Sequence, residues 1–99
     1  MPALIGKVAV VVGNGTPEHR SVAVALAESG ADIAIAGNAG VAEVLLHSIA
    51  NEIWAIGRRS TVVGLIGNDA ASFAQAVGKA AEELGRSDVV VRVDPVLSA

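Results

Sequence analysis

Residues 6–35 read GKVAVVVGNGTPEHRSVAVALAESGADIAI, and this stretch decides the fold. It opens with a β-branched run over residues 7–12 that is apolar on both faces, which is typical of a central parallel strand covered by helices. Thr16 and Pro17 then start a helix, because Thr caps helices well and Pro suits the first helical position. A glycine ends that helix, and a second short apolar strand follows over residues 32–36. The stretch predicts a strand, a tight turn, a helix and a second strand parallel to the first.

The same alternation continues along the rest of the chain. We expect, in order, a loop over residues 37–40, a helix over 41–56, a strand over 60–66, a helix that begins after Asp69 and ends at Gly85, and a strand over 89–93. Strands that alternate with helices imply a parallel sheet with right-handed crossovers. The sequence therefore predicts an α/β fold of three layers in a single domain over residues 1–99.

Helical spacing predicts which side chains are buried. The expected buried faces are Val22, Ala23, Leu26 and Ala27 in the first helix, Leu45, Ile49, Ile53 and Ile56 in the second, and Phe73, Val77, Ala80, Ala81 and Leu84 in the third. Trp54 lies off the stripe of its helix, beside His47 and Asn51. Two interpretations stay open for it: an anchor for an interface, or a ring that folds over the helix end and covers the core.

Composition excludes several classes of function. The 99 residues are 53% apolar with a net charge of −3, and they carry no basic stripe for nucleic acid. The chain has no Cys, which excludes thiolate metal sites, and its two His fall on different helices without a carboxylate at ligand spacing. No apolar run is long enough to span a membrane and no secretory signal is visible, so we expect a cytoplasmic protein.

The layout of residues 4–92 resembles the N-terminal Rossmann half of the short-chain dehydrogenase/reductase family. The resemblance rests on residues 6–35, on the Gly57-Arg58-Arg59 turn before the third strand, and on the passage EELGRSDVVV over residues 82–91. It implies a Rossmann-like sheet of strand order 3-2-1-4, with a dinucleotide across the carboxyl ends of strands one and four. It also implies that the catalytic Ser, Tyr and Lys of the family lie beyond the fourth strand. The chain contains no Tyr, so we expect no catalytic residue and no catalysis from this chain alone.

The glycine loop of the family is altered in this chain. The family pattern is a Gly, three residues, a Gly, one residue and a Gly, which lets pyrophosphate approach the helix N-terminus. Gly13 matches the first position, Pro17 and His19 stand at the other two, and Gly15 is an additional glycine within the loop. Two interpretations are open: a working phosphate cradle, or glycines that only turn the chain.

Charge near the loop also differs from what a dinucleotide needs. Glu18 brings a negative charge into the first helical turn, which suits the bare helix and repels an anionic ligand. We expect His19 and Arg20 to offset that charge in part.

The remaining contact positions are altered as well. Gly37 and Asn38 follow the second strand, where the family carries a charged residue for the ribose; Asn38 either bonds the ribose or makes a turn. Ile66 stands at the adenine-binding position after the third strand, and residues 92–95 replace an Asn-Asn-Ala-Gly segment. The candidate cofactor-binding residues are therefore Gly13, Asn14, Gly15 and Asn38, for weak NAD(P) binding or none, with no metal site.

Two functions remain open. Val89, Val90 and Val91 are expected to form an edge strand that is apolar on both faces, and such edges pair readily with another chain. The first function is a non-catalytic Rossmann-like module that forms a homo-oligomer or docks on a partner chain through this edge. The alternative is the nucleotide-binding half of an NAD(P)-dependent oxidoreductase completed by another chain. A flavodoxin-like strand order, 2-1-3-4-5, is a third and weaker interpretation of the fold.

Overall fold

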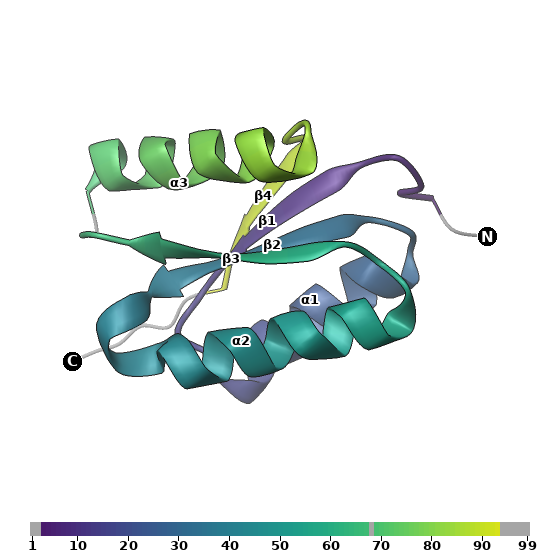
Figure 1. Ribbon diagram of the computed structural model, residues 1–99, viewed down its shortest axis with the longest axis horizontal. Coiled ribbons are helices and arrows are strands. Elements are labelled where there is room, and N and C mark those ends of the chain that lie inside the picture. Colours follow the sequence, from purple (N-terminus) through teal and green to yellow (C-terminus); the bar gives the residue numbers. More distant parts are fainter. Residues whose placement is uncertain (1–2, 68, 94–99) are drawn as a thin grey trace.

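A computed structural model describes residues 3–67 and 69–93, with the backbone alone at residues 39–42. Its elements are β1 (Val8–Val12), α1 (Pro17–Glu28), β2 (Asp32–Asn38), α2 (Ala39–Ile56), β3 (Ser60–Leu65), α3 (Ala70–Leu84) and β4 (Val89–Arg92). The strands form one parallel sheet in the order β3-β2-β1-β4 (Figure 1). The α/β fold with strand order 3-2-1-4 is confirmed, and the flavodoxin-like order is wrong.

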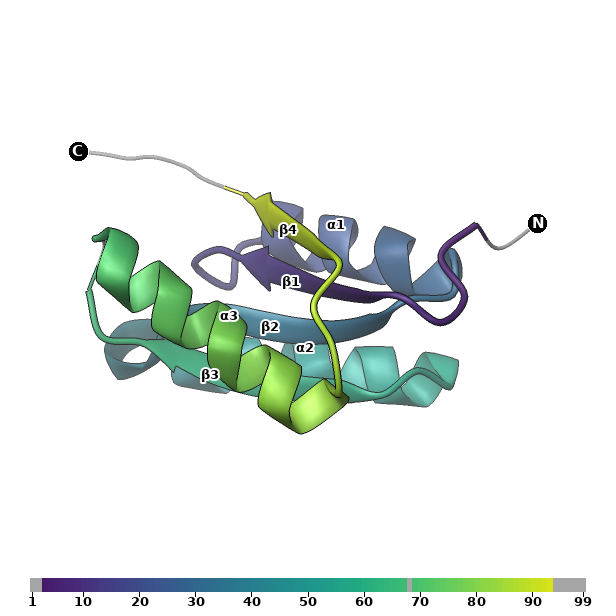
Figure 2. The ribbon, with the colours of Figure 1, turned by 90° about the horizontal axis from the view of Figure 1, so that it is seen from above.

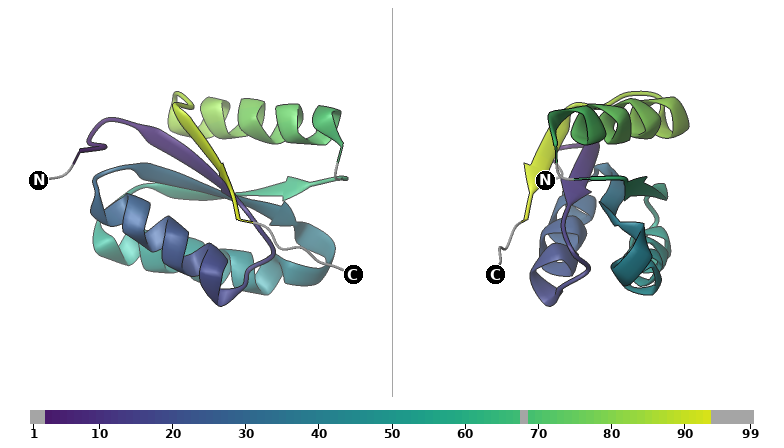
Figure 3. Two further views of the ribbon diagram at one scale, coloured as in Figure 1. Left: turned by 180° about the vertical axis from the view of Figure 1, so that it is seen from behind. Right: turned by 90° about the vertical axis from the view of Figure 1, so that its left-hand side faces the viewer.

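Helices cover both faces of the sheet. α1 and α2 lie side by side on one face, and of the described helices α3 alone lies on the other (Figures 1 and 3). Alternate residues of β1 and β2 point to opposite faces of the sheet, so each of these strands contributes side chains to both interfaces. One core cluster joins Ala9 and Val11 to α1 and α2, and the other joins Val8 and Val10 to α3. The centre of the sheet is thus buried on both faces, as the continuous apolar run in β1 predicts.

The expected loop over residues 37–40 is wrong. β2 runs to Asn38, which pairs with Leu65 of β3, and α2 begins at the next residue. Gly37 is therefore a strand residue, and its role is close packing. A Cβ placed on it would lie 2.4 Å from the Gly13 carbonyl oxygen.

The buried face of α2 differs in part from the expected stripe. Ile49 and Ile53 are buried as expected, but Leu46 takes the buried position given to Leu45, which is 51% exposed. Gly37 supplies the reason. The Leu46 methyl groups lie 3.1 and 3.2 Å from the place a Gly37 Cβ would occupy, so Leu46 fills the space that the glycine leaves. Ile56, also expected inside, is 39% exposed.

The other two helices follow their expected faces more closely. In α1, Ala23 and Ala27 are buried, and the flanking Val22 and Leu26 pack against the core while partly exposed. In α3 the buried residues are Ala76, Ala80 and Leu84; Phe73 packs at the margin, and Val77 and Ala81 are only partly buried. Thr16 and Asp69 cap α1 and α3 as predicted, through hydrogen bonds from the His19 and Ser72 amides.

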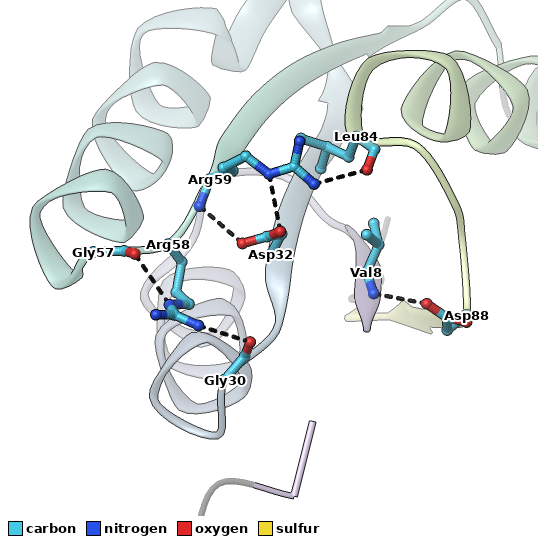
Figure 4. Close-up of polar contacts among 8 residues, drawn as sticks. All are labelled: Val8, Gly30, Asp32, Gly57, Arg58, Arg59, Leu84 and Asp88. Atoms are coloured by element: carbon cyan, nitrogen blue, oxygen red, sulfur yellow. Dashed lines mark hydrogen bonds and ion pairs between the residues drawn. The ribbon is translucent and has the colours of Figure 1, made fainter. Parts of the chain in front are cut away.

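Side-chain hydrogen bonds tie the amino ends of the strands together (Figure 4). Arg59, at the start of β3, donates through Nε to Asp32 of β2 at 3.0 Å and through Nη2 to the Leu84 carbonyl of α3 at 2.9 Å. Arg58 donates to the Gly30 carbonyl that follows α1. Asp88, before β4, accepts from the Val8 amide of β1 at 2.9 Å. Polar side-chain contacts therefore hold the amino ends of the strands to one another and to the neighbouring helices.

The surface carries one large exposed aromatic side chain among the described residues. Trp54 is 74% exposed on α2, so it does not cover the core. His47 and Asn51 are exposed beside it, and all three border a groove of about 580 Å³ along β3. The described helices include none that is long and apolar enough to cross a membrane.

Candidate functional site

The candidate residues lie at the carboxyl ends of two adjacent strands. Gly13, Asn14 and Gly15 directly follow β1, and Asn38 ends β2. The Gly13 amide donates to the Ala36 carbonyl of β2 at 3.0 Å, which joins the loop to the neighbouring strand. The fold therefore brings all four residues to the same edge of the sheet, the edge where ligands bind in open α/β folds.

The loop after β1 enters α1 with a regular cap. Gly15 has a φ of +76°, a left-handed conformation that glycine adopts without strain. The Thr16 hydroxyl accepts from the His19 amide at 3.3 Å, and Pro17 takes the first helical position, where its missing N–H costs nothing. The strand-turn-helix geometry that the sequence predicts is confirmed.

His19 is the residue that sequence reasoning missed. The ring is fully buried, and it packs on Gly13, where an added Cβ would lie 2.7 Å from the His19 Cγ. Its Nε2 lies 2.9 Å from the Val11 carbonyl oxygen, and its Nδ1 accepts from the Gly15 amide at 3.0 Å. Spacing carries the signal, since His19, Ala23 and Ala27 recur every four residues on the buried side of α1.

Burial sets the charge of this ring. Desolvation lowers the pKa of His19 from its ordinary value of 6.5, and the hydrogen bond with the Val11 carbonyl opposes that shift only in part. At neutral pH the imidazole is therefore uncharged. The side chain cannot supply the positive charge expected to offset Glu18, so that expectation is wrong for His19.

Arg20 forms an ion pair with a residue other than Glu18. Its Nη1 donates to Oε2 of Glu52 on α2 at 2.9 Å, which ties α1 to α2. Glu18 stays exposed in the first turn of α1. The negative charge near the loop consequently keeps no basic partner among the described residues.

Some of the hydrogen-bond donors of the loop and of the helix start are used within the protein. Gly15 donates to the His19 ring, the His19 amide donates to Thr16, and Pro17 has no N–H. An anion at a helix N-terminus depends on such free amides. The loop has the shape of a phosphate-binding turn, but its own side chains occupy part of the hydrogen-bonding capacity.

A groove runs beside this loop, between α1 and α2. It has a volume of about 480 Å³, and its lining includes Asn14, Gly15, Arg20, Leu45 and Ser48. Residues of the loop and of the start of α1 line one side, and Leu45, Ser48 and Ile49 of α2 line the other, which is mostly apolar. The partial exposure of Leu45, which the sequence placed in the core, contributes to that apolar wall.

The edge strand β4 is the second candidate surface. Among the described strands its one neighbour is β1, and it lies at the margin of the sheet (Figure 2). Val90 is 53% exposed on the α3 side of the sheet, while Val89 and Val91 are partly buried. The Arg92 guanidinium, at the end of β4, lies 4.5 Å from the centre of the Phe73 ring of α3.

Side chains that bind metal ions do not cluster in the described part of the chain. Residues 3–67 and 69–93 hold no group of three His, Asp or Glu side chains that could bind a metal ion. His19 is buried in α1 beneath the loop, and His47 is exposed on α2, with its Nε2 3.8 Å from Oε2 of Glu43. Asp94 and Pro95, which belong to the segment that replaces the family's Asn-Asn-Ala-Gly, lie outside the described residues.

Comparison with known proteins identifies the relatives of this fold. A curated short-chain dehydrogenase/reductase, FrzI of Cladobotryum sp, is 32% identical over 90 residues, which are 91% of this chain and 34% of that protein. The structure of a blue fluorescent protein from a metagenomic library, solved with NADPH, superposes with a TM-score of 0.84 at 32% identity, over 96% of this chain and 38% of the other.

The chain is a homologue of the Rossmann half of short-chain dehydrogenase/reductases.

The match to this family extends over almost the whole chain. Carveol dehydrogenase from Mycobacterium avium, solved in complex with NAD, superposes with a TM-score of 0.84 at 28% identity, over 97% of this chain and 38% of the other. No protein-family model matches the sequence. The chain spans about a third of the length of the curated short-chain dehydrogenase/reductases that it matches.

Proposed function

We propose that the chain is a non-catalytic Rossmann module that self-associates through the edge of β4. The observation that carries the proposal is the exposed strand itself: within the described residues β4 pairs with β1 alone, and the side chain of Val90 in its middle is half exposed. A row of unpaired amides and carbonyls beside apolar side chains favours pairing with another strand. If the β4 strands of two copies pair antiparallel about a two-fold axis, each strand supplies hydrogen-bond partners for the unpaired amides and carbonyls of the other.

The direction of the backbone groups in β4 defines how that pairing would occur. The Val93 amide donates to the Val12 carbonyl of β1 at 2.7 Å. Because amides alternate sides along a strand, the amides of Val89 and Val91 also point toward β1, and those of Val90 and Arg92 point to the open edge. Val90 therefore offers both an outward donor and an exposed apolar side chain.

The non-catalytic part of the proposal rests on chemistry. Residues 1–99 include no tyrosine, so they do not themselves supply the family's proton-transfer Tyr. In the first turn of α1, His19 is buried with its pKa lowered by desolvation, and Arg20 is bound to Glu52 of α2. The parts that build the sheet are kept while the groups that would act on a substrate are absent from the described residues.

Sedimentation velocity between about 1 and 100 µM tests the proposal. We expect a dimer whose population rises with concentration. Val90→Pro removes the outward amide while leaving the donors toward β1, so it should yield a monomer with an unchanged far-UV circular dichroism spectrum. Val90→Thr keeps both the donor and the strand preference and should still dimerise. A wild-type chain that stays monomeric at the highest concentration would overturn the proposal.

A second function, NAD(P) binding, is favoured by the comparison structures solved with NADPH and with NAD. In it, Gly13, Asn14 and Gly15 would approach the pyrophosphate and Asn38 the ribose. The internal bonding of the loop and the exposed Glu18 predict weak affinity. Titration calorimetry with NADH and NADPH at millimolar concentration decides between the functions. Heat that saturates, together with a raised unfolding temperature, supports binding; the absence of both removes this candidate.

A further inference from the structure

We propose that His19 is a pH-sensitive latch that holds the Gly13–Thr16 loop closed against β1. The ring lies under the loop, fully buried, and hydrogen-bonds a strand carbonyl on one side and a loop amide on the other. This inference does not depend on whether the chain dimerises or binds a nucleotide.

The two hydrogen bonds fix the tautomer. The Gly15 amide is a donor, so the Nδ1 atom that faces it at 3.0 Å must be an acceptor. The proton of the neutral ring therefore resides on Nε2, which donates to the Val11 carbonyl at 2.9 Å. Both ring nitrogens are satisfied, and the ring links the end of β1 to the loop that follows it.

Protonation breaks this arrangement at a defined atom. A proton added to Nδ1 would point at the Gly15 N–H, so two donors would face each other across 3.0 Å. The bond would be lost and a buried charge created. Such a charge is costly unless a partner compensates it.

No described side chain offers that compensation. The groups against the ring are backbone: the Val11 carbonyl from β1, Gly13 beneath it and the Gly15 amide from the loop. Of the neighbouring charged residues on α1, Glu18 is exposed and Arg20 is bound to Glu52 of α2. The depressed pKa of His19 agrees with this environment.

Acidification should therefore release the loop before it unfolds the sheet. Gly15 has the freedom to move because it is a glycine already at positive φ. The charged ring would leave its seat over Gly13, and the Gly15 amide would turn toward solvent. The carboxyl edge of β1 thus has a closed form at neutral pH and an open form in acid.

Nuclear magnetic resonance of the ¹⁵N-labelled chain tests the latch directly. At about pH 7.5 the imidazole nitrogens of His19 should show Nε2 protonated and Nδ1 bare. On titration, the Gly15 amide resonance should move with the same midpoint as the His19 ring, below 6.5, while β2 amides stay unchanged. A ring protonated on Nδ1 at neutral pH, or a Gly15 resonance indifferent to the titration of the ring, would overturn the proposal.

Two variants separate the latch from general acid effects. His19→Asn keeps an acceptor near the Nδ1 position but does not titrate, so the acid transition of Gly15 should disappear. His47→Asn changes the exposed histidine of α2 and should leave the transition intact. A transition that persists in His19→Asn, or that vanishes in His47→Asn, contradicts the latch. If His19→Asn fails to fold, the tautomer and titration of the wild-type chain still decide.

Discussion

Single residues decide how the carboxyl edge of this sheet is built. Where the short-chain dehydrogenase/reductase pattern has its third glycine, this chain places His19, whose ring is buried over Gly13. The sequence predicts the turn, because Gly13, Thr16 and Pro17 have strong local preferences. It does not predict that the His19 ring is buried. A polar ring can be buried here because it bonds a carbonyl of β1 and an amide of the loop, and only the folded chain brings these groups together.

The first prediction concerns stability and pH. The folded chain holds the pKa of His19 below 6.5, so the unfolded chain binds more protons as pH falls. Stability contributed by the neutral ring is fully present above 6.5 and is lost as pH falls toward the folded value. The loss approaches about 1.4 kcal/mol for each pH unit by which the pKa is depressed.

Urea unfolding at about pH 7.5 and pH 5 measures this effect. His19→Asn should show a smaller change between the two conditions, whereas His47→Asn should behave as the parent chain. Asp69 and Asp88, whose pKa values are lowered by hydrogen bonds from Ser72 and Arg86 respectively, lose their contributions only below about 3.8, so the two windows are distinct. Stability that is flat from pH 7.5 to pH 5 would refute the prediction.

The second prediction concerns Gly37. Gly37→Ala would bring a Cβ to 2.4 Å from the Gly13 carbonyl oxygen, a backbone atom that has little room to relax, and within 3.1 Å of a Leu46 methyl group. Overpacking of this kind should cost at least about 2 kcal/mol of unfolding free energy. Chemical denaturation with circular dichroism measures it. A variant as stable as the parent would show that β1 and β2 are not held so closely at this point.

At the scale of elements, the strands are the most predictable part of the chain. β1, β2, β3 and β4 all lie within or close to their expected ranges, since short β-branched runs between glycines specify strands strongly. α2 shows what local sequence leaves open. Leu45 and Leu46 fit helical spacing with Ile49 and Ile53 about equally well, and the choice of Leu46 depends on the space beside Gly37, which comes from a different element.

The third prediction concerns α3, where one glycine has no packing role. Gly78 is exposed within the helix, and nothing lies within 4 Å of the place its Cβ would occupy. Gly78→Ala should therefore stabilise the chain by about 0.5–1 kcal/mol through helix preference and reduced freedom of the unfolded chain. For a domain of this size the unfolding temperature should rise by roughly 2–8 °C, which calorimetry can measure.

Gly78→Ala also serves as the control for Gly37→Ala, since the same atom is added in both. One position has open space and the other meets a backbone oxygen. Opposite signs of the stability change are expected. A loss of stability in Gly78→Ala would mean that this face of α3 contacts something absent from the described packing.

On the scale of the whole molecule, the two ends of the sheet differ in how they are held. The amino end is closed by side-chain bonds from Arg58, Arg59 and Asp88. At the carboxyl end, the loop after β1 is held by His19, a group that can titrate. Motion and binding are therefore expected at the carboxyl end, while the amino end keeps the three layers in register.

The last prediction tests that amino end through Arg59. Its guanidinium joins Asp32 of β2 to the Leu84 carbonyl, the last of α3, so one side chain spans the sheet and the α3 layer (Figure 4). The side chain is 62% exposed, which weakens the ion pair through solvent screening. The bond to a carbonyl at the helix C-terminus adds to the stabilisation, because that end of a helix favours a cation.

Arg59→Ala should lower the free energy of unfolding by about 1 kcal/mol, as measured by urea unfolding. Arg86→Ala is the matched control, since the one partner of Arg86 among residues 3–67 and 69–93 is Asp88, two residues away, and its loss should cost clearly less. Equal losses in the two variants would mean that Arg59 acts as an ordinary surface charge, and the register of α3 on the sheet would then depend on its apolar face alone.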